Sequence, residues 1–428
     1  MKPFPTVIMM IFLGLALFGV VIFATFTAST REQIGAVAIW GALPEETMSE
    51  VLRKVKDSRE DFNDVTYREF PPEALVPAVI EAIAANRGPD LVLLPSTAIV
   101  KDEEKFMHMP YEWVSRRDFQ DAFVEAGEAY LLDDGVLGLP FMIDPTVMYW
   151  NRTLFANAGI SNPPRYWDEL AKVAPLLTTR TPNGSIAVSA VPLGLWSNVA
   201  HAKEVLVTLS TQLGNPIMVR TPEGYSANLE DADSVGVSPF LSAVRFTTDF
   251  ADPVKPMYSW NRSQKNSRDA FLSGTLALYF APASELLSIR EANPNLNFDV
   301  ASLPQSRGAG QNVFAALTAL SIPRGSQNPE GAFAVATQLV SPDTQAHVSE
   351  LTVLPSTRRD VTLDASRDAY LAVFQASALR AFSFLDPAPQ ESDAVFSRMI
   401  ESIASGAKTH GEAVRIANGD LQALVRVR

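Results

Sequence analysis

The protein is a chain of 428 residues, of which 47% are hydrophobic and 19% are charged. Its 35 Lys and Arg against 48 Asp and Glu give a formal charge of −13, which argues against nucleic acid as a partner, because phosphate backbones are bound mainly through basic side chains. The lack of cysteine excludes disulfides, iron–sulfur clusters, thiol nucleophiles and lipidated cysteine anchors. At roughly 150 residues per domain, the length predicts two to three domains.

The first 30 residues differ in composition from the rest of the chain. Residues 7–26 form an apolar run without a charge, preceded by Lys2. A helix of this length, at about 1.5 Å per residue, spans the roughly 30 Å core of a bilayer. We therefore expect residues 1–30 to be a single membrane anchor that leaves the body outside the cytoplasm. A signal cleaved near residue 29, releasing a secreted or periplasmic body, and a buried soluble helix are the alternatives.

Predicted strands and helices alternate at the start of the body. The strands are residues 34–40, 64–70 and 90–94, and the helices run from Glu45 and over residues 73–86. Apolar residues in the first helix recur at i, i+3, i+4 and i+7, namely Met48, Val51, Leu52 and Val55. Gly88 is expected to end the second helix. The alternation predicts a parallel sheet with right-handed crossovers.

The later elements alternate less regularly. A hairpin or crossover is expected over residues 134–143. Predicted strands are residues 147–151, 276–280, 298–303 and 315–322. Predicted helices are residues 153–157, 166–177, 202–213, 284–291, 329–340 and 412–428. The middle of the chain, residues 179–262, is rich in Pro, Gly, Ser and Asn and cannot be ordered from its pattern.

Four stretches of the body carry a family resemblance. The first holds Gly138-Leu139-Pro140, Met148-Tyr149-Trp150-Asn151, Ala158-Gly159-Ile160, Pro163-Pro164 and Trp167-Asp168-Glu169-Leu170. The others are residues 270–278, residues 322–332 with 351–355 behind them, and the strand ending at Trp40 together with Gly88-Pro89-Asp90. In their order and spacing along the chain, these stretches resemble the family 1 extracellular solute-binding proteins of ABC transporters. Tyr166 stands where that family usually has a helix-capping Thr, so this cap is expected to be lost or replaced.

The resemblance implies an α/β fold with two lobes of the periplasmic-binding-protein type (type II) and a hinge between them. Lobe I would comprise residues 34–141 and 315–350, and lobe II residues 142–314 and 351–428. The connecting strands would cross near residues 139–144 and 309–314.

The function that the resemblance implies is capture of a small solute between the lobes and its delivery to ABC permease subunits. A sugar or oligosaccharide is the expected solute. A solute-sensing receptor subunit and, further away, a membrane-anchored glycan-active enzyme are the alternative functions.

Five candidate ligand-binding residues lie at predicted strand ends, in the following loop and beside the hinge: Trp40, Glu45, Ser96, Thr97 and Asp144. Ligands of parallel α/β sheets collect at the carboxyl ends of the strands. Trp40 would stack on a sugar face, and the polar residues would bind sugar hydroxyls. Core packing, a solvated first helical turn and turn formation are the alternative roles of these residues.

Three further candidates follow from the resemblance alone: Trp196, Phe280 and Leu354. Relatives often have Gly followed by an aromatic residue where this chain has Ala281 and Pro282, with Phe280 one position earlier. This departure weakens any assignment of a particular sugar.

Catalytic and metal-binding patterns are lacking in the sequence. The pairs Glu45/Glu46 and Asp133/Asp134 are merely adjacent, which says nothing about the opposed carboxylates of a glycosidase. His201 and His347 have neither a metal-ligand spacing nor a Ser–Asp arrangement beside them, so each is expected to be a surface or hydrogen-bonded residue. We therefore expect no enzyme activity, no cofactor and no metal.

Overall fold

A computed structural model describes residues 34–232, 236–308, 310–362 and 369–426. Its first elements are β1 (Val37–Gly41), α2 (Glu45–Ser58), β2 (Val65–Glu69), α3 (Pro72–Ala84) and β3 (Leu91–Pro95). β1 lies between β2 and β3 and is parallel to both, with Val37 opposite Val65 and Ile39 opposite Leu91. The parallel βαβαβ arrangement expected from the sequence is confirmed.

The two helices of this unit follow their sequence patterns, with one correction. In α2, Met48, Val51, Leu52 and Val55 are all buried, as their spacing predicts. In the turn after α3, the residue with a left-handed backbone is Asn86, with φ of 52°, while Gly88 has no positive φ. The expectation that Gly88 ends this helix was wrong, because the chain turns two residues earlier at an Asn, which tolerates this conformation.

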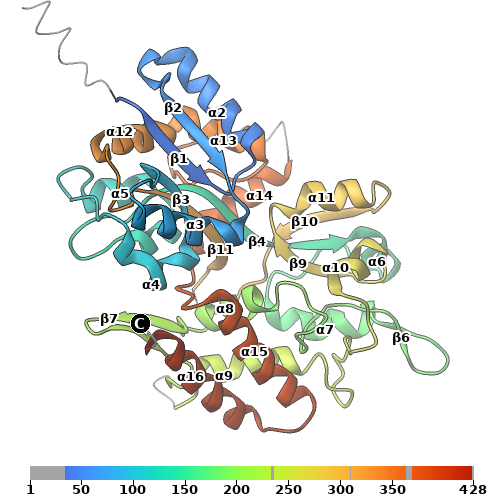
Figure 1. Cartoon of the computed structure of the whole chain (residues 1–428). Coiled ribbons are helices and arrows are strands. Elements are labelled where there is room, and N and C mark those ends of the chain that lie inside the picture. Colours follow the sequence, from blue (N-terminus) through green and yellow to red (C-terminus); the bar gives the residue numbers. More distant parts are fainter. Residues whose placement is uncertain (1–33, 233–235, 309, 363–368, 427–428) are drawn as a thin grey trace, which may run out of the picture.

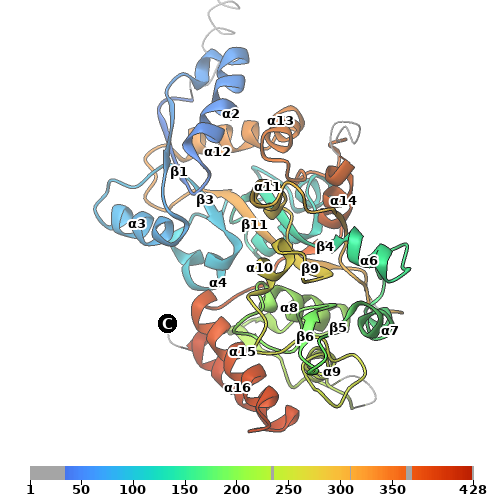
Figure 2. The ribbon, with the colours of Figure 1, turned by 90° about the vertical axis from the view of Figure 1, so that its right-hand side faces the viewer.

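Short helical segments connect β3 to the next strand. They are η2 (Ser96–Ala98), α4 (Ile99–Asp102), η3 (Glu103–Lys105), α5 (Arg116–Ala122) and η4 (Glu125–Tyr130). Among them, α4 lies at the end of the first lobe that faces the second half of the molecule (Figures 1 and 2).

Two strands connect the halves of the molecule. β4 (Leu139–Asn151) pairs through residues 139–145 with β11 (Val313–Ser321), and through residues 146–151 with β9 (Leu278–Pro282) and β10 (Phe298–Ser302). β11 also pairs with β3, Thr318 lying opposite Pro95. Among the described residues these strands, with β1, β2 and the short β12 (Ala381–Phe382), form one eight-stranded sheet through both lobes. Of the hairpin or crossover expected over residues 134–143, residues 139–143 begin β4, which continues into the second lobe, while Val136 before it forms isolated antiparallel bridges with Met109 and Leu131.

The second lobe surrounds β9 and β10 with helices. These are α6 (Arg152–Asn157), α7 (Trp167–Leu177), α8 (Ala202–Gln212), α9 (Pro239–Thr248), α10 (Ser267–Leu272) and α11 (Glu285–Ala292). Two small hairpins, β5–β6 (Thr179–Arg180 and Ile186–Val188) and β7–β8 (Met218–Thr221 and Gly224–Ala227), lie at its periphery. They belong to the segment that the sequence could not order.

Glu169 replaces the missing cap at the start of α7. Its carboxylate accepts hydrogen bonds from the backbone N–H groups of Arg165 at 2.9 Å and Tyr166 at 3.3 Å. Arg307 lies over the Tyr166 ring, 3.8 Å from its centroid, and pairs with Glu169 at 2.8 Å. An acidic side chain in the first turn thus holds the backbone donors that precede the helix.

The remaining helices return to both halves. α12 (Pro329–Leu339) and α13 (Pro342–Thr352) lie beside β1 and α2, while α14 (Ala369–Ala378) packs on β4 and β10. α15 (Pro389–Ala404) and α16 (His410–Arg426) pack together at the far end of the second lobe (Figure 2). The expected lobe boundaries at residues 141/142, 314/315 and 350/351 fall inside β4, β11 and α13.

The lobes also meet at the β7–β8 hairpin. Arg220 donates to the Leu131 carbonyl of the first lobe at 2.8 Å, and Tyr225 Oη donates to Glu103 Oε2 at 2.8 Å. Arg220 and Glu103 lie 3.8 Å apart, and Arg220 also donates to Tyr225 at 3.0 Å. Gln422 of α16 accepts from Ser226 and Ala227 and so ties the hairpin to the second lobe. We call Glu103, Arg220 and Tyr225 the hairpin contact.

None of the helices within the described ranges is both long and apolar enough to cross a membrane. The apolar run over residues 7–26, on which the expected anchor depends, lies outside the described residues.

Candidate functional site

One face of the crossing strands is open in the middle of the sheet. In β11 the buried Ala315 and Leu317 alternate with the half-buried Phe314 and Thr318 and the exposed Ala316. The neighbouring half-buried residues of β4 are Met142, opposite Thr318, and Asp144, opposite Ala316. Because side chains two apart share one face of a strand, these five residues lie together on the same open side. We call Met142, Asp144, Phe314, Ala316 and Thr318 the cleft floor.

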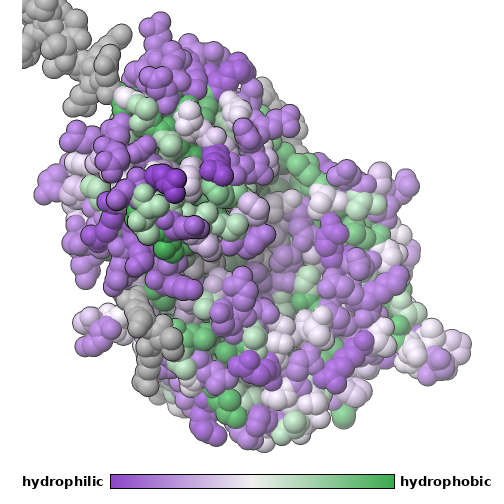
Figure 3. All heavy atoms as spheres, in the orientation of Figure 1, coloured by the Kyte–Doolittle hydropathy of each residue, from purple (hydrophilic) through white to green (hydrophobic). Residues whose placement is uncertain are grey.

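An apolar cavity of about 240 Å³ adjoins this floor at the carboxyl ends of β1 and β3. Leu43 and Pro44 of the β1–α2 loop, Leu75 of α3, Leu93 of β3 and Met142 and Thr318 of the floor contribute to its lining. The parallel strands end here because the chain leaves the sheet after Gly41 and Pro95. In the space-filling view the surface is hollowed between the two lobes, and hydrophilic residues cover most of the outer face (Figure 3).

Acidic residues lie beside the cavity at the β1–α2 loop. Glu69 at the end of β2 accepts a hydrogen bond from the backbone N–H of Glu45 at 2.7 Å. Both Glu45 and Glu69 are exposed. Tyr67 Oη donates to the Leu43 carbonyl at 2.6 Å, and burial with the nearby Glu69 charge raises the Tyr67 pKa. The predicted residue Glu45 therefore comes directly after Pro44, which lines the cavity. The Glu69 carboxylate beside it was not predicted from the sequence.

Trp40 lies at the end of β1 and is half-buried. Its ring centroid is 4.6 Å from that of Phe70, and the Arg68 guanidinium lies over both rings, at 5.4 Å and 4.6 Å. Trp40 does not belong to the residues that line the cavity. Its role as a stacking surface for a ligand stays a prediction, now with Phe70 and Arg68 as its neighbours.

Ser96 and Thr97 follow β3 in η2. Ser96 is 3% exposed and Thr97 is half-buried. Pro95, directly before them, lines the cavity. The two hydroxyl residues thus begin the turn next to the cavity, and hydrogen bonding to a ligand remains a prediction for both.

Asp144 lies where β4 changes partners from β11 to β9. Its carboxylate accepts a hydrogen bond from the backbone N–H of Ser284 at 3.0 Å. Burial raises the pKa of Asp144 to about 6, although the hydrogen bonds at Ser284 and the charge of His201 act in the opposite direction. A carboxyl group with this pKa changes its protonation near physiological pH.

A network of charged side chains continues from Asp144 into the second lobe. Glu285 receives His201 Nε2 at 2.8 Å, Arg268 Nε at 3.1 Å and Tyr279 Oη at 3.0 Å. Glu204 lies 4.0 Å from His201 Nδ1. Burial alone lowers the pKa of His201, but hydrogen bonds and charges from Glu204 and Glu285 outweigh burial and raise the pKa to about 9. We call His201, Glu204, Arg268, Tyr279 and Glu285 the Glu285 cluster.

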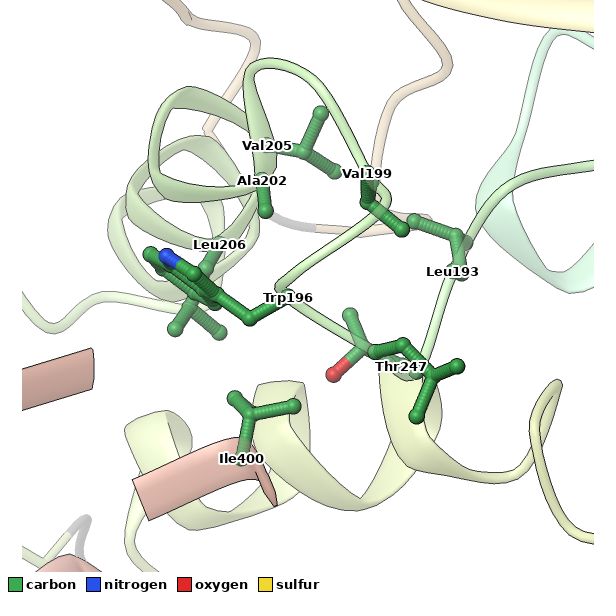
Figure 4. Close-up of a pocket in the computed structure, with 10 residues that line it drawn as sticks. Leu193, Trp196, Val199, Ala202, Val205, Leu206, Thr247 and Ile400 are labelled. Atoms are coloured by element: carbon green, nitrogen blue, oxygen red, sulfur yellow. The ribbon is translucent and has the colours of Figure 1, made fainter. Parts of the chain in front are cut away.

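Three of the predicted ligand-binding residues are buried in packing. Trp196 is 8% exposed, its Nε1 donates to Asp393 at 3.2 Å, and it borders a small separate cavity beside Leu206 of α8 (Figure 4). Phe280 is 2% exposed, with its ring 5.7 Å from that of Trp167. Leu354 is 7% exposed in the apolar core around β9. Ligand binding by these three side chains remains a prediction.

The residues that sequence reasoning missed are Met142, Phe314, Ala316 and Thr318. The signal for Phe314, Ala316 and Thr318 is the alternation of burial over residues 313–319 of β11, whereas Met142 lies two residues before Asp144 on β4. Within the described ranges no group of three or more His, Asp or Glu residues could hold a metal ion.

Residues 47–346 match the family model of the bacterial extracellular solute-binding proteins. A curated relative, a binding protein of Brucella abortus (strain 2308), is 22% identical over 371 residues, which cover 83% of this chain and 84% of the relative.

Two solved structures with similar folds are solute-binding proteins. One is an ABC transporter solute-binding protein from Thermotoga lettingae bound with α-D-tagatose, with a TM-score of 0.66, 21% identity, and coverage of 91% of this chain and 99% of that one. Another is the sugar-binding protein MalE from Xanthomonas citri, with a TM-score of 0.74, 18% identity, and coverage of 91% and 97%. These similarities show the two-lobe α/β fold expected from the sequence. Because the family model spans most of the body, the chain belongs to the bacterial extracellular solute-binding proteins.

Proposed function

We propose that this protein captures a carbohydrate between its lobes and delivers it to the transmembrane subunits of an ABC importer. The observation that carries the proposal is the cleft floor, an open face of two central strands next to the carboxyl ends of β1 and β3. The tagatose-bound and MalE structures with the same fold support carbohydrate as the ligand class. The ligand would favour the closed state by the difference between its affinities for the closed and open states.

The polar contacts to the solute would come from the cleft floor and from the loop beside the cavity. Asp144 and Thr318 lie on the floor, and Glu45 comes directly after Pro44 of the cavity lining. Carboxylate and hydroxyl oxygens accept hydrogen bonds from sugar hydroxyls. Trp40, Ser96 and Thr97 at the strand ends are the next candidates.

Lobe I would comprise residues 34–141 and 315–350, and lobe II residues 142–314 and 351–428. Residues 7–26 would anchor this body at the outer side of the cell membrane and keep it near its permease. N-terminal sequencing of the mature protein, together with membrane fractionation, tests the anchor; a soluble protein that begins near residue 30 would contradict it.

The function as a binding protein is tested by a thermal-shift screen with sugars, polyols, amino acids and peptides. A ligand at 100 times its dissociation constant adds about 2.7 kcal/mol to the free energy of unfolding. We expect one or more carbohydrates to raise the midpoint and to be recovered chemically unchanged. A shift with amino acids or peptides and with no carbohydrate would overturn the carbohydrate assignment. Recovery of a cleaved glycan would instead indicate an enzyme, and co-purification of permease subunits would separate transport from signalling.

A further inference from the structure

The cavity beside the cleft floor is suited to an apolar group and poorly suited to a sugar ring. Among the described residues that line the cavity, Thr318 supplies the sole polar side chain, and the Leu43 carbonyl already accepts a hydrogen bond from Tyr67. A sugar ring bound against this lining would leave the hydroxyls that face the lining without partners, which is unfavourable. An alkyl or aryl group would lose no hydrogen bonds on entering.

The size of the cavity points to a substituent rather than to a whole ligand. Its volume of about 240 Å³ exceeds that of an apolar cavity of roughly 150 Å³ that holds benzene. A phenyl ring or a short alkyl chain therefore fits.

Hydrogen-bond acceptors begin where the apolar lining ends. Glu45 follows Pro44 of the cavity wall, and Glu69 lies within hydrogen-bond distance of the Glu45 backbone. On the other side, Asp144 is two residues beyond Met142 on the same face of β4. An apolar interior with acceptors outside it matches a ligand that has one apolar end and one hydroxylated end.

We propose that the solute of this protein is a carbohydrate with an apolar substituent, such as an alkyl or aryl glycoside, and that the substituent fills the cavity while the sugar lies on the cleft floor. This inference rests on the proposed function, because it places the sugar in the same cleft.

The test uses the full chain in a buffer free of glycoside detergents, with the Met methyl groups labelled with ¹³C. Benzyl alcohol serves as a probe that does not depend on the identity of the sugar. Methyl and phenyl glycosides of glucose, galactose, mannose and xylose serve as matched pairs. We expect benzyl alcohol to shift the Met142 methyl signal saturably, and the phenyl glycoside of the accepted sugar to bind about 10-fold or more tightly than its methyl partner.

Three variants separate the apolar contact from general damage. Met142→Gln keeps a similar shape with a polar end and should reduce the phenyl-to-methyl preference to about 1, roughly a 10-fold loss. Met142→Leu keeps the apolar surface and should retain the preference. Thr318→Val removes the hydroxyl; both glycosides then lose the sugar contact proposed for it, while the phenyl-to-methyl preference should be retained or increased. Circular dichroism checks that each variant is folded.

The outcomes distinguish this inference from the proposed function. Equal binding of methyl and phenyl glycosides, with no shift of Met142, would overturn the inference and leave carbohydrate binding standing. Saturable binding of benzyl alcohol at Met142 without binding of any carbohydrate would support the apolar cavity and contradict the carbohydrate assignment. If neither probe nor glycoside bound, both proposals would fail.

Discussion

The apolar cavity and the Glu285 cluster stand on either side of the cleft floor and are held together by different forces. The cavity is lined by apolar side chains such as Leu75, Leu93 and Met142, whose burial depends little on pH. The Glu285 cluster instead joins Glu285 to His201, Arg268 and Tyr279 through hydrogen bonds and ion pairs.

Because of this difference, we expect the cavity to bind part of the ligand and the Glu285 cluster to hold Asp144 in place. The cavity can bind an apolar group without any preformed polar contact, whereas the Glu285 cluster fixes the backbone around Ser284 and through it Asp144. Changes in the cavity should therefore act on ligand preference and packing, and changes in the cluster on stability and pH dependence.

The largest expected effect is that of Glu285→Ala. The substitution leaves His201, Arg268 and Tyr279 without their shared, largely buried partner. Removing one member of such a network should lower the free energy of unfolding by about 3 kcal/mol. Urea denaturation at pH 7 measures the loss.

The matched control for this substitution is Glu291→Ala on the same helix, since Glu291 is exposed. It should change the free energy of unfolding by less than about 0.5 kcal/mol. Equal effects of the two substitutions would show that the cluster contributes no more than a surface residue.

Leu75→Ala tests how much the side chains around the apolar cavity contribute to stability. Leu75 is 2% exposed and borders the cavity, so the space left by the shorter side chain would join an existing volume. We expect a loss of about 2 kcal/mol, at the low end for a buried Leu, and the same loss at pH 5 and pH 8. Leu287, which is 49% exposed, provides the Leu→Ala control. A loss that varied with pH would contradict the separation of the two regions.

Asp144→Asn tests the link between the regions. The folded protein binds a proton at Asp144 more readily than the unfolded chain does, because the pKa is raised from 3.8 to about 6. The free energy of unfolding of the unsubstituted protein should therefore decrease as pH rises from about 4 to about 6. The Asn variant lacks this decrease and should be about 1 kcal/mol more stable above pH 6, a figure kept small because the side chain is half-buried.

Denaturation from pH 3.5 to 8 measures the Asp144 effect. The variant and the unsubstituted protein should approach similar stability at pH 3.5, where the carboxyl group is protonated in the folded state and mostly protonated in the unfolded chain. Parallel pH profiles over the whole range would contradict the raised pKa.

The smallest expected effect on stability is that of Arg220→Ala in the hairpin contact. Arg220 and Glu103 keep 34% and 21% of their side-chain surface exposed, so the loss should stay below about 1 kcal/mol. The unliganded lobes should nevertheless open more often, because Arg220 joins the hairpin to Leu131. Small-angle X-ray scattering should show a larger radius of gyration than for Arg220→Lys, which keeps the charge. Identical scattering of both variants and the unsubstituted protein would exclude a role in closure.

Much of the fold could be predicted where short-range patterns decide it. The apolar spacing of Met48, Val51, Leu52 and Val55 requires one buried helical face, and all four residues are buried. Gly88 shows the limit of such patterns, since a Gly near a helix end does not determine which residue turns left-handed. Asn86 takes that conformation instead.

The candidate site was predicted less completely, because its residues come together only through strand pairing. Met142 and Thr318 lie far apart in the sequence and become neighbours only because β4 and β11 pair. Aromatic residues posed a second difficulty, since the same ring can stack on a ligand or fill a core. The Trp196 and Phe280 side chains are packed, and no local pattern separates the two uses.

The sequence by itself determined the alternation of strands and helices, the parallel first sheet and the solute-binding family, because these depend on local periodicity and on motifs in order. Only the tertiary structure decided which face of the crossing strands is open, which residues line the apolar cavity and which carboxyl group of the cleft floor has a raised pKa. Those properties depend on burial and on the distances between residues far apart in the chain, which pairing and packing establish together.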